Sequence, residues 1–466
     1  MFKKKLCLFI LPVSILMACN KSSTNFNFPD PNANNGTQSP IPDKKVSSAI
    51  QGIILDEANK PVAGASVKCG ELTATTDANG SFQFAKVNAN EVAAVVTAQK
   101  TGYFTGVRTF RIATPDKLQF VRIQLLPKKS VGVFDAATGG TITISNTQFT
   151  FVAQQVLGAD NKPYSGKVSL FYASVNPERA DYADIMPGDL RAITKSNTLT
   201  AIQSFGMMAL ELQSESGEKL HLDTSKSVTF KMPIPVSLKN IAPDAVPLWH
   251  FEDSSRVWRE DGSATKAGDT YTGTLKYFTT WTPALSFNTV NFRVTVQDAS
   301  GTPLPNISLG FKGGIGHPSF GYTNEEGVFA GHISKNETLT LMVSNGCNTI
   351  IESRIVGPFQ DSTNLGVLRL NPLTDRYLHF SGLVTNCSNT AVKNGAVYVT
   401  VDGVEYRSTI TNGKYAIGII CCNTDNTTAH FKAIDTDTNK SVTSDMVVTP
   451  KDYIKDLLAC DLTSAE

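Results

Sequence analysis

The feature of this sequence that most restricts its fold is a turn-and-strand pattern that occurs three times. Each copy begins with an alternating run ending in Asp or Asn and continues through a second alternating run. It closes with a turn ending in Gly, with an aromatic residue two positions later. The copies cover residues 51–56, 61–67 and 76–82; residues 292–298, 303–309 and 323–329; and residues 380–386, 391–397 and 411–415. Alternation with a period of two is typical of half-buried strands, so the repeat predicts an all-β chain of several small sandwiches.

Each part of the pattern has a physical reason. An Asp or Asn at the end of the first run can hydrogen-bond to the backbone ahead of it and start a turn. Proline then restricts φ where the chain re-enters the sheet, and Gly supplies a positive φ that other residues adopt only with strain. We therefore expect Gly80 and Gly327 to have positive φ in equivalent hairpins.

Length and composition agree with this expectation. The chain has 466 residues, too many for one core, and fits roughly three or four domains. Hydrophobic residues make up 41% and charged residues 18%, with 34 Gly and 22 Pro, and no stretch beyond the N-terminal leader has a convincing helical period. The formal net charge is +1 with both signs interspersed, so we expect no nucleic-acid partner.

The repeated pattern resembles the carboxypeptidase regulatory-like domain, a small Greek-key, prealbumin-like β-sandwich. The resemblance assigns such a sandwich to residues 46–128, a second to 288–373 and a third, divergent one to 374–466. The third copy has Ala391 in place of Pro, and its last turn is two residues shorter. In metallocarboxypeptidases this module is an accessory to the catalytic domain, and elsewhere it is a spacer or binding domain of secreted and surface proteins.

The middle of the chain, residues 129–287, has a different pattern and is predicted to be a larger β-rich domain. Its short segments at 186–190, 248–251, 257–262 and 277–281 resemble a region of the cartilage intermediate layer protein and its relatives. The resemblance implies an extracellular β-rich segment without an established catalytic role.

The N-terminus has the pattern of an export signal. Lysines at positions 3–5 precede an apolar run at 6–16, and Leu-Met-Ala stands directly before Cys19. This resembles the lipobox of bacterial lipoproteins, which implies that residues 1–18 are a signal peptide and that Cys19 is lipidated; an ordinary signal peptide is the alternative. Residues 19–45, rich in Asn, Pro and Ser, then form a disordered tether of about 25–30 Å. We expect an exported protein anchored by lipid to the cell envelope, in an outer membrane if the resemblance holds.

Five cysteines near the C-terminus are candidates for disulfides, because export places them in an oxidising compartment. They are Cys347, Cys387, Cys421, Cys422 and Cys460. Cys421 and Cys422 are adjacent in a predicted strand and so point to opposite faces. Cys387 is expected to pair with Cys422 or Cys460, and one of the five remains free. The connectivity stays open at this point.

Two groups of side chains are candidates for ligand binding. Trp249, Trp258 and Trp281 could form a stacking face for a sugar, or they could fill the core, since each buries a large area. Asp435, Asp437 and Asn439 have the alternate spacing of a calcium loop, but Lys440 and Met446 stand where such a loop needs Gly and Glu. The alternative for this segment is the tip of a hairpin. We therefore expect no metal site and no cofactor.

No sequence motif indicates catalysis. The histidines lack the HxxE and HExxH spacings, and there is neither a Gly-x-Ser-x-Gly elbow nor a P-loop. The sequence therefore favours a lipid-anchored protein that presents non-catalytic binding or spacer modules to a glycan or an envelope protein. Two alternatives are a carbohydrate-binding lipoprotein of a polysaccharide-uptake system and a hydrolase whose active site is assembled from distant residues.

Overall fold

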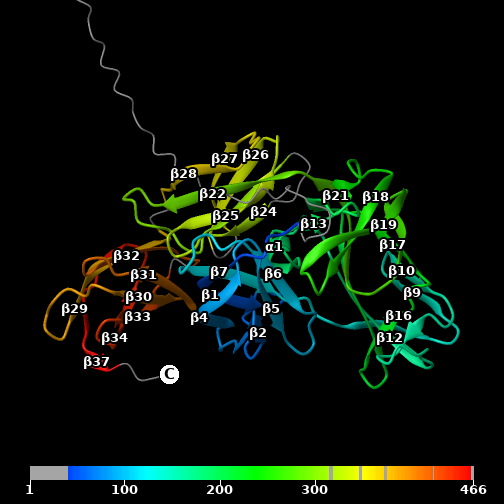
Figure 1. The fold of residues 1–466 in the computed structure, drawn as a ribbon, viewed down its shortest axis with the longest axis horizontal. Coiled ribbons are helices and arrows are strands. Elements are labelled where there is room, and N and C mark those ends of the chain that lie inside the picture. The colour runs from blue at the N-terminus through cyan, green and yellow to red at the C-terminus, as the bar shows by residue number, and fades with distance from the viewer. Residues whose placement is uncertain (1–39, 314–318, 346–348, 372–374, 423–424, 463–466) are drawn as a thin grey trace, which may run out of the picture.

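The computed structural model describes residues 40–313, 319–345, 349–371, 375–422 and 425–462 (Figure 1). Nearly all regular structure in these residues is β, which confirms the predicted fold class. The short helices are α1 (Tyr182–Ile185) and η1 (Val236–Leu238). No helix in the described ranges is long and apolar enough to cross a membrane. The predicted signal peptide, Cys19 and most of the tether lie outside these ranges.

The first repeat forms a sandwich of two sheets with the strand orders β4-β1-β7 and β3-β2-β5-β6. Its strands are β1 (Lys45–Leu55), β2 (Ser66–Cys69), β3 (Leu72–Thr75), β4 (Ser81–Asn90), β5 (Ala94–Gln99), β6 (Gly106–Phe110) and β7 (Leu118–Gln124). Strand β1 pairs with β4 in the antiparallel and β7 in the parallel direction. The side chains of Ile50, Ile54, Val67 and Val96 fill the space between the two sheets.

The second repeat has the same strand order, β25-β22-β28 facing β24-β23-β26-β27. Its strands are β22 (Thr289–Gln297), β23 (Ser308–Lys312), β24 (Ser319–Tyr322), β25 (Val328–Ser334), β26 (Leu339–Ser344), β27 (Ile350–Val356) and β28 (Thr363–Arg369). The parallel pairing of first and last strand is also repeated, between β22 and β28.

The third repeat keeps this order in spite of its divergent sequence. Its sheets are β32-β29 with β35 and β36, and β31-β30-β33-β34-β37. Its strands are β29 (Tyr377–Asn386), β30 (Gly395–Val401), β31 (Val404–Thr409), β32 (Lys414–Ile420), β33 (Thr427–Asp435), β34 (Lys440–Val448), β35 (Asp452–Ile454), β36 (Leu457–Ala459) and β37 (Asp461–Leu462). The last strand of the pattern is here split into β35 and β36, which both pair with β29 in the parallel direction.

The turn glycines occupy equivalent places in all three sandwiches. Gly80 and Gly327 both have φ of +71°, as expected, and Gly413 of the third copy has +76°. The carbonyl of each glycine accepts a hydrogen bond from the first strand of its sandwich, for example from the amide of Ile54 at 2.8 Å. A Cβ on Gly80 would lie 2.5 Å from the Ile54 carbonyl oxygen, and one on Gly327 would lie 2.2 Å from that of Val296. Only glycine fits this turn without displacing the backbone.

The central domain is built around one large, mostly antiparallel sheet of 14 strands. Its strands are β8 (Ser130–Asp135), β9 (Gly140–Ile144), β10 (Thr147–Phe151), β11 (Val156–Leu157), β12 (Lys167–Val175), β13 (Arg191–Ile193), β14 (Leu199–Ser204), β15 (Met207–Ser214), β16 (Lys219–Leu222), β17 (Val228–Pro233), β18 (Ala245–Glu252), β19 (Val257–Ala267), β20 (Thr270–Leu275) and β21 (Thr280–Phe287). Aromatic and aliphatic side chains from its strands form two hydrophobic clusters.

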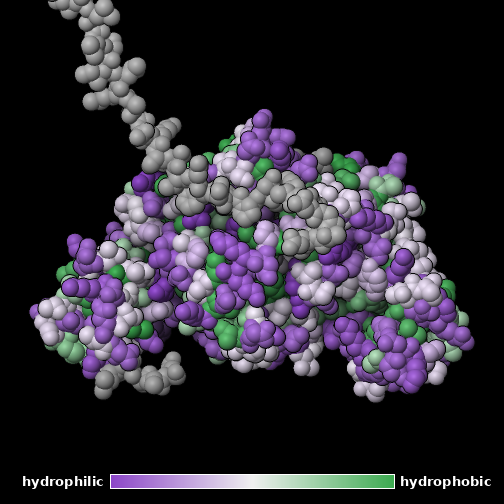
Figure 2. Space-filling model, in the orientation of Figure 1, coloured by the Kyte–Doolittle hydropathy of each residue, from purple (hydrophilic) through white to green (hydrophobic). Residues whose placement is uncertain are grey.

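The domains do not follow one another in space in the order of the chain. The first sandwich lies in the middle, between the central domain and the third sandwich, and the second sandwich lies beside it (Figure 1). Hydrophobic clusters cross three of the boundaries: Val107 joins a cluster of the central domain, Ala113 joins Val328, and Ile420 joins the core of the second sandwich. On the face drawn in Figure 2, hydrophobic residues lie scattered among hydrophilic ones. The four domains therefore share buried contacts instead of hanging on flexible linkers.

Candidate functional site at the domain junctions

The three tryptophans do not form a ligand face. Trp249, Trp258 and Trp281 are each 1% exposed. Their indole N–H groups donate to main-chain carbonyls, with distances of 2.9 to 3.0 Å. Because a ring must be accessible to stack on a sugar, the structure overturns this candidate: the rings fill the core of the central domain, and each buries its polar nitrogen with a partner.

The calcium candidate is a hairpin turn between β33 and β34. Asp435 is 2% exposed, and its carboxylate accepts hydrogen bonds from the amide of Asp437 and the hydroxyl of Thr438. The side chain of Asp437 accepts from the amide of Asn394, while Asn439 has φ of +54°. These oxygens already serve the turn, and the described residues contain no group of three or more metal-binding side chains.

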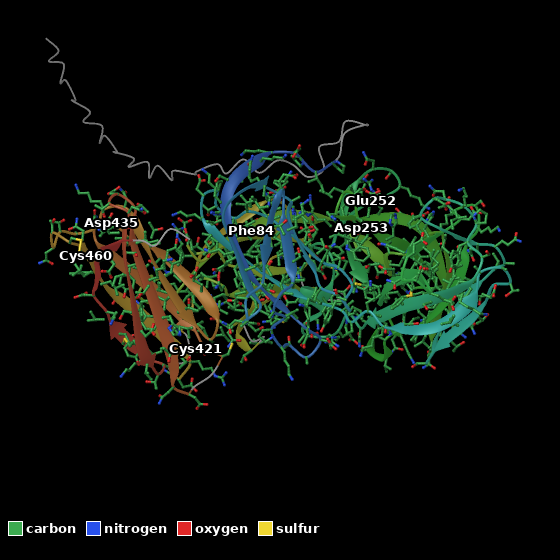
Figure 3. All side chains as sticks on the ribbon, turned by 90° about the horizontal axis from the view of Figure 1, so that it is seen from below. Phe84, Glu252, Asp253, Cys421, Asp435 and Cys460 are labelled. Carbon is green, nitrogen blue, oxygen red and sulfur yellow. A yellow bond between two sulfur atoms is a disulfide. The ribbon has the colours of Figure 1, made fainter. Side chains whose placement is uncertain are left out.

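The cysteine candidates separate to two ends of the third sandwich. Cys387 and Cys460 form a disulfide with a Cα–Cα distance of 4.8 Å, joining the segments that follow β29 and β36. Cys421 lies at the opposite end, where β32 pairs with the beginning of β29 (Figure 3). It is free and buried, with its side chain facing the core, which fits the expectation that one of the five cysteines remains free. Cys422 is disulfide-bonded, and Cys347 lies outside the described residues.

One arrangement resembles the catalytic triad that the hydrolase alternative requires. The hydroxyl of Thr302 lies 3.3 Å from Nε2 of His379, whose Nδ1 lies 3.7 Å from a carboxylate oxygen of Asp452. In a working triad the acid is buried and hydrogen-bonded to the histidine, and the hydroxyl faces a substrate cleft. Here the Asp452 side chain is 83% exposed, and Thr302 is buried in a turn that its own amide closes onto Asp298. This geometry supports an interface contact, not a nucleophile.

A buried ion pair joins the three repeats. Both carboxylate oxygens of Glu325, in the second sandwich, accept hydrogen bonds from Arg407 of the third, with distances of 2.8 and 2.7 Å. Lys117 of the first sandwich lies 3.9 Å from the same carboxylate. Burial raises the pKa of Glu325, and Arg407 and Lys117 oppose that rise. A single carboxylate thus holds charged groups from both neighbouring sandwiches.

A second polar junction joins the first sandwich to the central domain and the second sandwich. Asp184 in α1 pairs with Arg122 of β7 at 3.2 Å and accepts a hydrogen bond of 2.9 Å from the hydroxyl of Tyr322 in β24. Arg108 of β6 donates to the carbonyls of Ala183 and Gly188. Burial raises the pKa of Asp184, and the neighbouring arginines counteract this rise. Helix α1 is short, but it supplies the carboxylate on which three domains meet.

A pocket of about 320 Å³ lies where the first and third sandwiches meet beside the second. Its wall is mostly apolar and includes Phe120, Tyr406 and Ile420. Asn306 lines it with a buried side-chain amide nitrogen that has no hydrogen-bond partner. Cys421 lines it as well, but burial raises the pKa of this thiol to about 12, so the thiol is protonated at neutral pH. The pocket can enclose a small apolar group, Asn306 offers that group a hydrogen-bond donor, and the protonated thiol of Cys421 is a weak nucleophile.

The sequence analysis missed the residues at these junctions. Arg108, Arg122 and Glu325 lie within the recognised repeats, but their partners at the junctions are at least 62 residues away in the chain. The sequence does contain a signal for Arg108 in β6 and Arg122 in β7. An arginine within a mostly apolar strand indicates a buried contact with a charged partner.

Comparison with known proteins finds a family match within the first sandwich. Residues 49–126 match the carboxypeptidase regulatory-like domain. The chain is 22% identical over 230 residues to cartilage intermediate layer protein 2 of Mus musculus, which is 46% of this chain and 19% of that protein. It is 26% identical over 119 residues to the Homo sapiens protein, which is 24% of this chain and 9% of that protein. The chain therefore matches less than a fifth of the length of these relatives.

Among solved structures, the Streptococcal ancillary pilin is 10% identical, with a TM-score of 0.16 over 48% of this chain and 93% of the pilin. BcpA, the major pilin subunit of Bacillus cereus, is 12% identical, with a TM-score of 0.15 over 70% of this chain and all of the pilin subunit. The family match lies within the first sandwich, whose strands and turn glycine follow the repeated pattern: residues 49–126 match the carboxypeptidase regulatory-like domain.

Proposed function

We propose that this protein is a lipid-anchored component of the cell envelope whose four β-domains form one rigid, non-catalytic body with a structural or adhesive role. The observation that carries the proposal is that the first sandwich shares buried contacts with all three other domains. Spacer modules that hold an envelope structure at a fixed distance need such stiffness, whereas domains joined by small polar interfaces move relative to one another.

The contacts at the junctions support a mechanical role. Val107 is part of a core of the central domain, and the side-chain amide of Gln51 donates to the carbonyl of Glu405 in the third sandwich. Ser81 donates to Gly403 of the same hairpin at 2.8 Å. The two hydrogen bonds use main-chain acceptors, which are present whatever the neighbouring side chains. The domain arrangement is thereby fixed through the backbone.

Lipid anchoring is the part of the proposal that a single substitution tests. In cells given a labelled fatty acid, Cys19→Ser should abolish labelling of the protein and move it from the membrane fraction to the soluble one. Cys7→Ser is the matched control, because it also removes a cysteine from the N-terminal segment but leaves Cys19, and it should keep both label and membrane association. If Cys19→Ser remains labelled and membrane-bound, the anchor is wrong.

The rigid-body part has its own test. Arg407→Met removes the charge that joins the second and third sandwiches, and small-angle scattering of the full chain should then show an increased radius of gyration. Arg354→Met, on the exposed face of β27, is the control and should leave the scattering curve unchanged. A wild-type curve that already requires several domain arrangements would contradict the proposal.

A further inference from the structure

A small cavity lies where the first sandwich, the second sandwich and the central domain meet. It has a volume of about 60 Å³. Its wall comes from β6 and β7, from β24 and β25, and from Asp189 of the central domain. A single water needs roughly 10–15 Å³ by this measure, so the cavity has room for several waters or for one small oxyanion.

Among the charged and titratable side chains in the wall of this cavity, the basic ones outnumber the acidic one. The basic residues that line it are Arg108, Arg111, Arg122 and His332, and the acidic residue is Asp189. Asp184 pairs with Arg122 and is also the carboxylate that most favours the charge of Arg108, ahead of Asp189, so one carboxylate serves two guanidinium groups. Arg108 is 5% exposed, and its hydrogen bonds go to uncharged main-chain carbonyls. A buried cation in such surroundings is costly unless negative charge is added.

His332 provides the second, independent observation. Both ring nitrogens of this β25 residue are buried and have no hydrogen-bond partner. In either tautomer of the neutral ring, one of them carries a proton that needs an acceptor. Burial, together with Arg191 and Arg111, lowers the pKa of His332 well below its ordinary value, so the ring is neutral. A small anion would supply both the acceptor that His332 lacks and the negative charge that the arginines need.

We propose that this cavity binds a small tetrahedral oxyanion, of the phosphate or sulfate class, between Arg108, Arg111 and His332. Guanidinium groups bind such anions through paired, charge-assisted hydrogen bonds, and the neutral imidazole donates one more. The two arginines belong to the first sandwich and His332 to the second. The bound anion therefore ties these sandwiches together, and it stabilises the folded chain as its concentration rises.

Thermal unfolding of the full chain tests this proposal. The midpoint is measured at constant ionic strength while chloride is replaced in steps by phosphate, by sulfate or by acetate. Phosphate or sulfate should raise the midpoint to a plateau, and acetate should not. His332→Phe removes the N–H and occupies space in the cavity, and Arg111→Gln removes one guanidinium. We expect each to weaken the apparent affinity at least tenfold. Arg354→Gln, an exposed arginine paired with Glu352, is the matched control and should keep the wild-type affinity.

Three outcomes overturn the proposal. An unchanged midpoint in phosphate and sulfate means that the cavity holds only water. A rise without a plateau, equal in wild type and both cavity variants, is a general salt effect. A saturable response to acetate alone contradicts the tetrahedral class. If His332→Phe does not fold, which circular dichroism detects, Arg111→Gln decides between the same outcomes. Failure here leaves the lipid anchor untouched, because that proposal depends on Cys19.

Discussion

The second and third sandwiches share a strand order but stabilise the turn before the shared glycine differently. The second uses a polar, hydrogen-bonded side chain there, and the third uses an apolar one. In the second, Thr323 is buried behind the turn; its hydroxyl accepts from the amide of Ile307 and donates to the carbonyl of Leu304, at 2.9 and 2.7 Å. Thr76 does the same in the first sandwich. In the third, the equivalent position is Ile410, which is equally buried but joins the hydrophobic core. Its amide keeps the hydrogen bond to the carbonyl of Gly395.

The strand ends differ in the same way. In the second sandwich, the amide of Leu370 donates to the carbonyl of Gln297 and so joins the end of the last strand to the end of the first. In the third, the disulfide between Cys387 and Cys460 joins the corresponding segments. The comparison teaches that the backbone hydrogen bonds and the turn glycine define this fold. The side chains behind them can be polar, apolar or covalently linked.

The turn glycine, which all three sandwiches share, should give the largest effect. Gly327→Val imposes both a positive φ on a β-branched residue and a clash with the Val296 carbonyl, so it should destabilise the second sandwich by about 3 kcal/mol or more. Gly102→Val is the control, since Gly102 has φ of +87° but open space around it, and should cost about 1–2 kcal/mol. Hydrogen exchange in the full chain measures the stability loss of each variant. Equal losses in the two variants would mean that the clash with the Val296 carbonyl is unimportant.

Breaking the disulfide should be the next largest effect, and it should be confined to the third sandwich. Cys387→Ser with Cys460→Ser opens a link between residues 73 positions apart, which should cost about 2–4 kcal/mol. Hydrogen exchange should accelerate in β29 and β36 and stay unchanged in β22 and β28. The matched control is Cys69→Ala, which removes a buried thiol without a disulfide. Equal protection of β29 before and after the change would show that the backbone pairing alone is sufficient.

The buried threonine should contribute less than the disulfide. Thr323→Val keeps the shape but leaves the Ile307 amide and the Leu304 carbonyl without their partner, so it should destabilise the second sandwich by about 1–3 kcal/mol. Ile410→Val in the third sandwich removes only one methylene and should cost about 1 kcal/mol. Thr323→Ser, which retains the hydroxyl, is the control. The interpretation fails if Thr323→Val and Thr323→Ser have the same stability.

The smallest effect should be a pH dependence of the Asp298 turn, which the equivalent turn of the third sandwich lacks. Asp298 and Asn386 close equivalent turns, but only Asp298 can titrate. Burial alone would raise the pKa of Asp298, but hydrogen bonds from Tyr377, Ser300 and the Thr302 amide lower it below its usual 3.8. Since the folded pKa is the lower one, this stabilisation is complete above the usual value and is lost as the pH falls through the folded value. Between about pH 5 and about pH 2, the free energy of unfolding should therefore fall less steeply in Asp298→Asn than in the wild type, by about 1 kcal/mol or less. Denaturant unfolding at each pH measures both slopes. An identical slope in both proteins would contradict this.

The repeat was readable because its residues act locally. Gly80 and Gly327 have the expected positive φ because the turn requires it within four residues, and alternating strands were recognised from their period of two. The same local reasoning failed for Trp249, Trp258 and Trp281, since an aromatic side chain has the same sequence signal in a core as on a binding face. Alternation predicted that Cys421 and Cys422 point to opposite faces and that one of the five cysteines remains free, but it did not decide which of the two faces the core.

By itself, the sequence determined the all-β class, the three repeated sandwiches and the turns that close them, because each depends on residues that are neighbours in the chain. Only the tertiary structure decided that the four domains share buried contacts. It also decided that Asp184, Arg122 and Tyr322 meet. In the same way, it placed His332 near Arg111 and left both ring nitrogens of His332 without a hydrogen-bond partner. These contacts join residues that can be more than a hundred positions apart, and their energy comes from removing charges from water. No local pattern encodes that, because desolvation depends on what the rest of the chain places around each group.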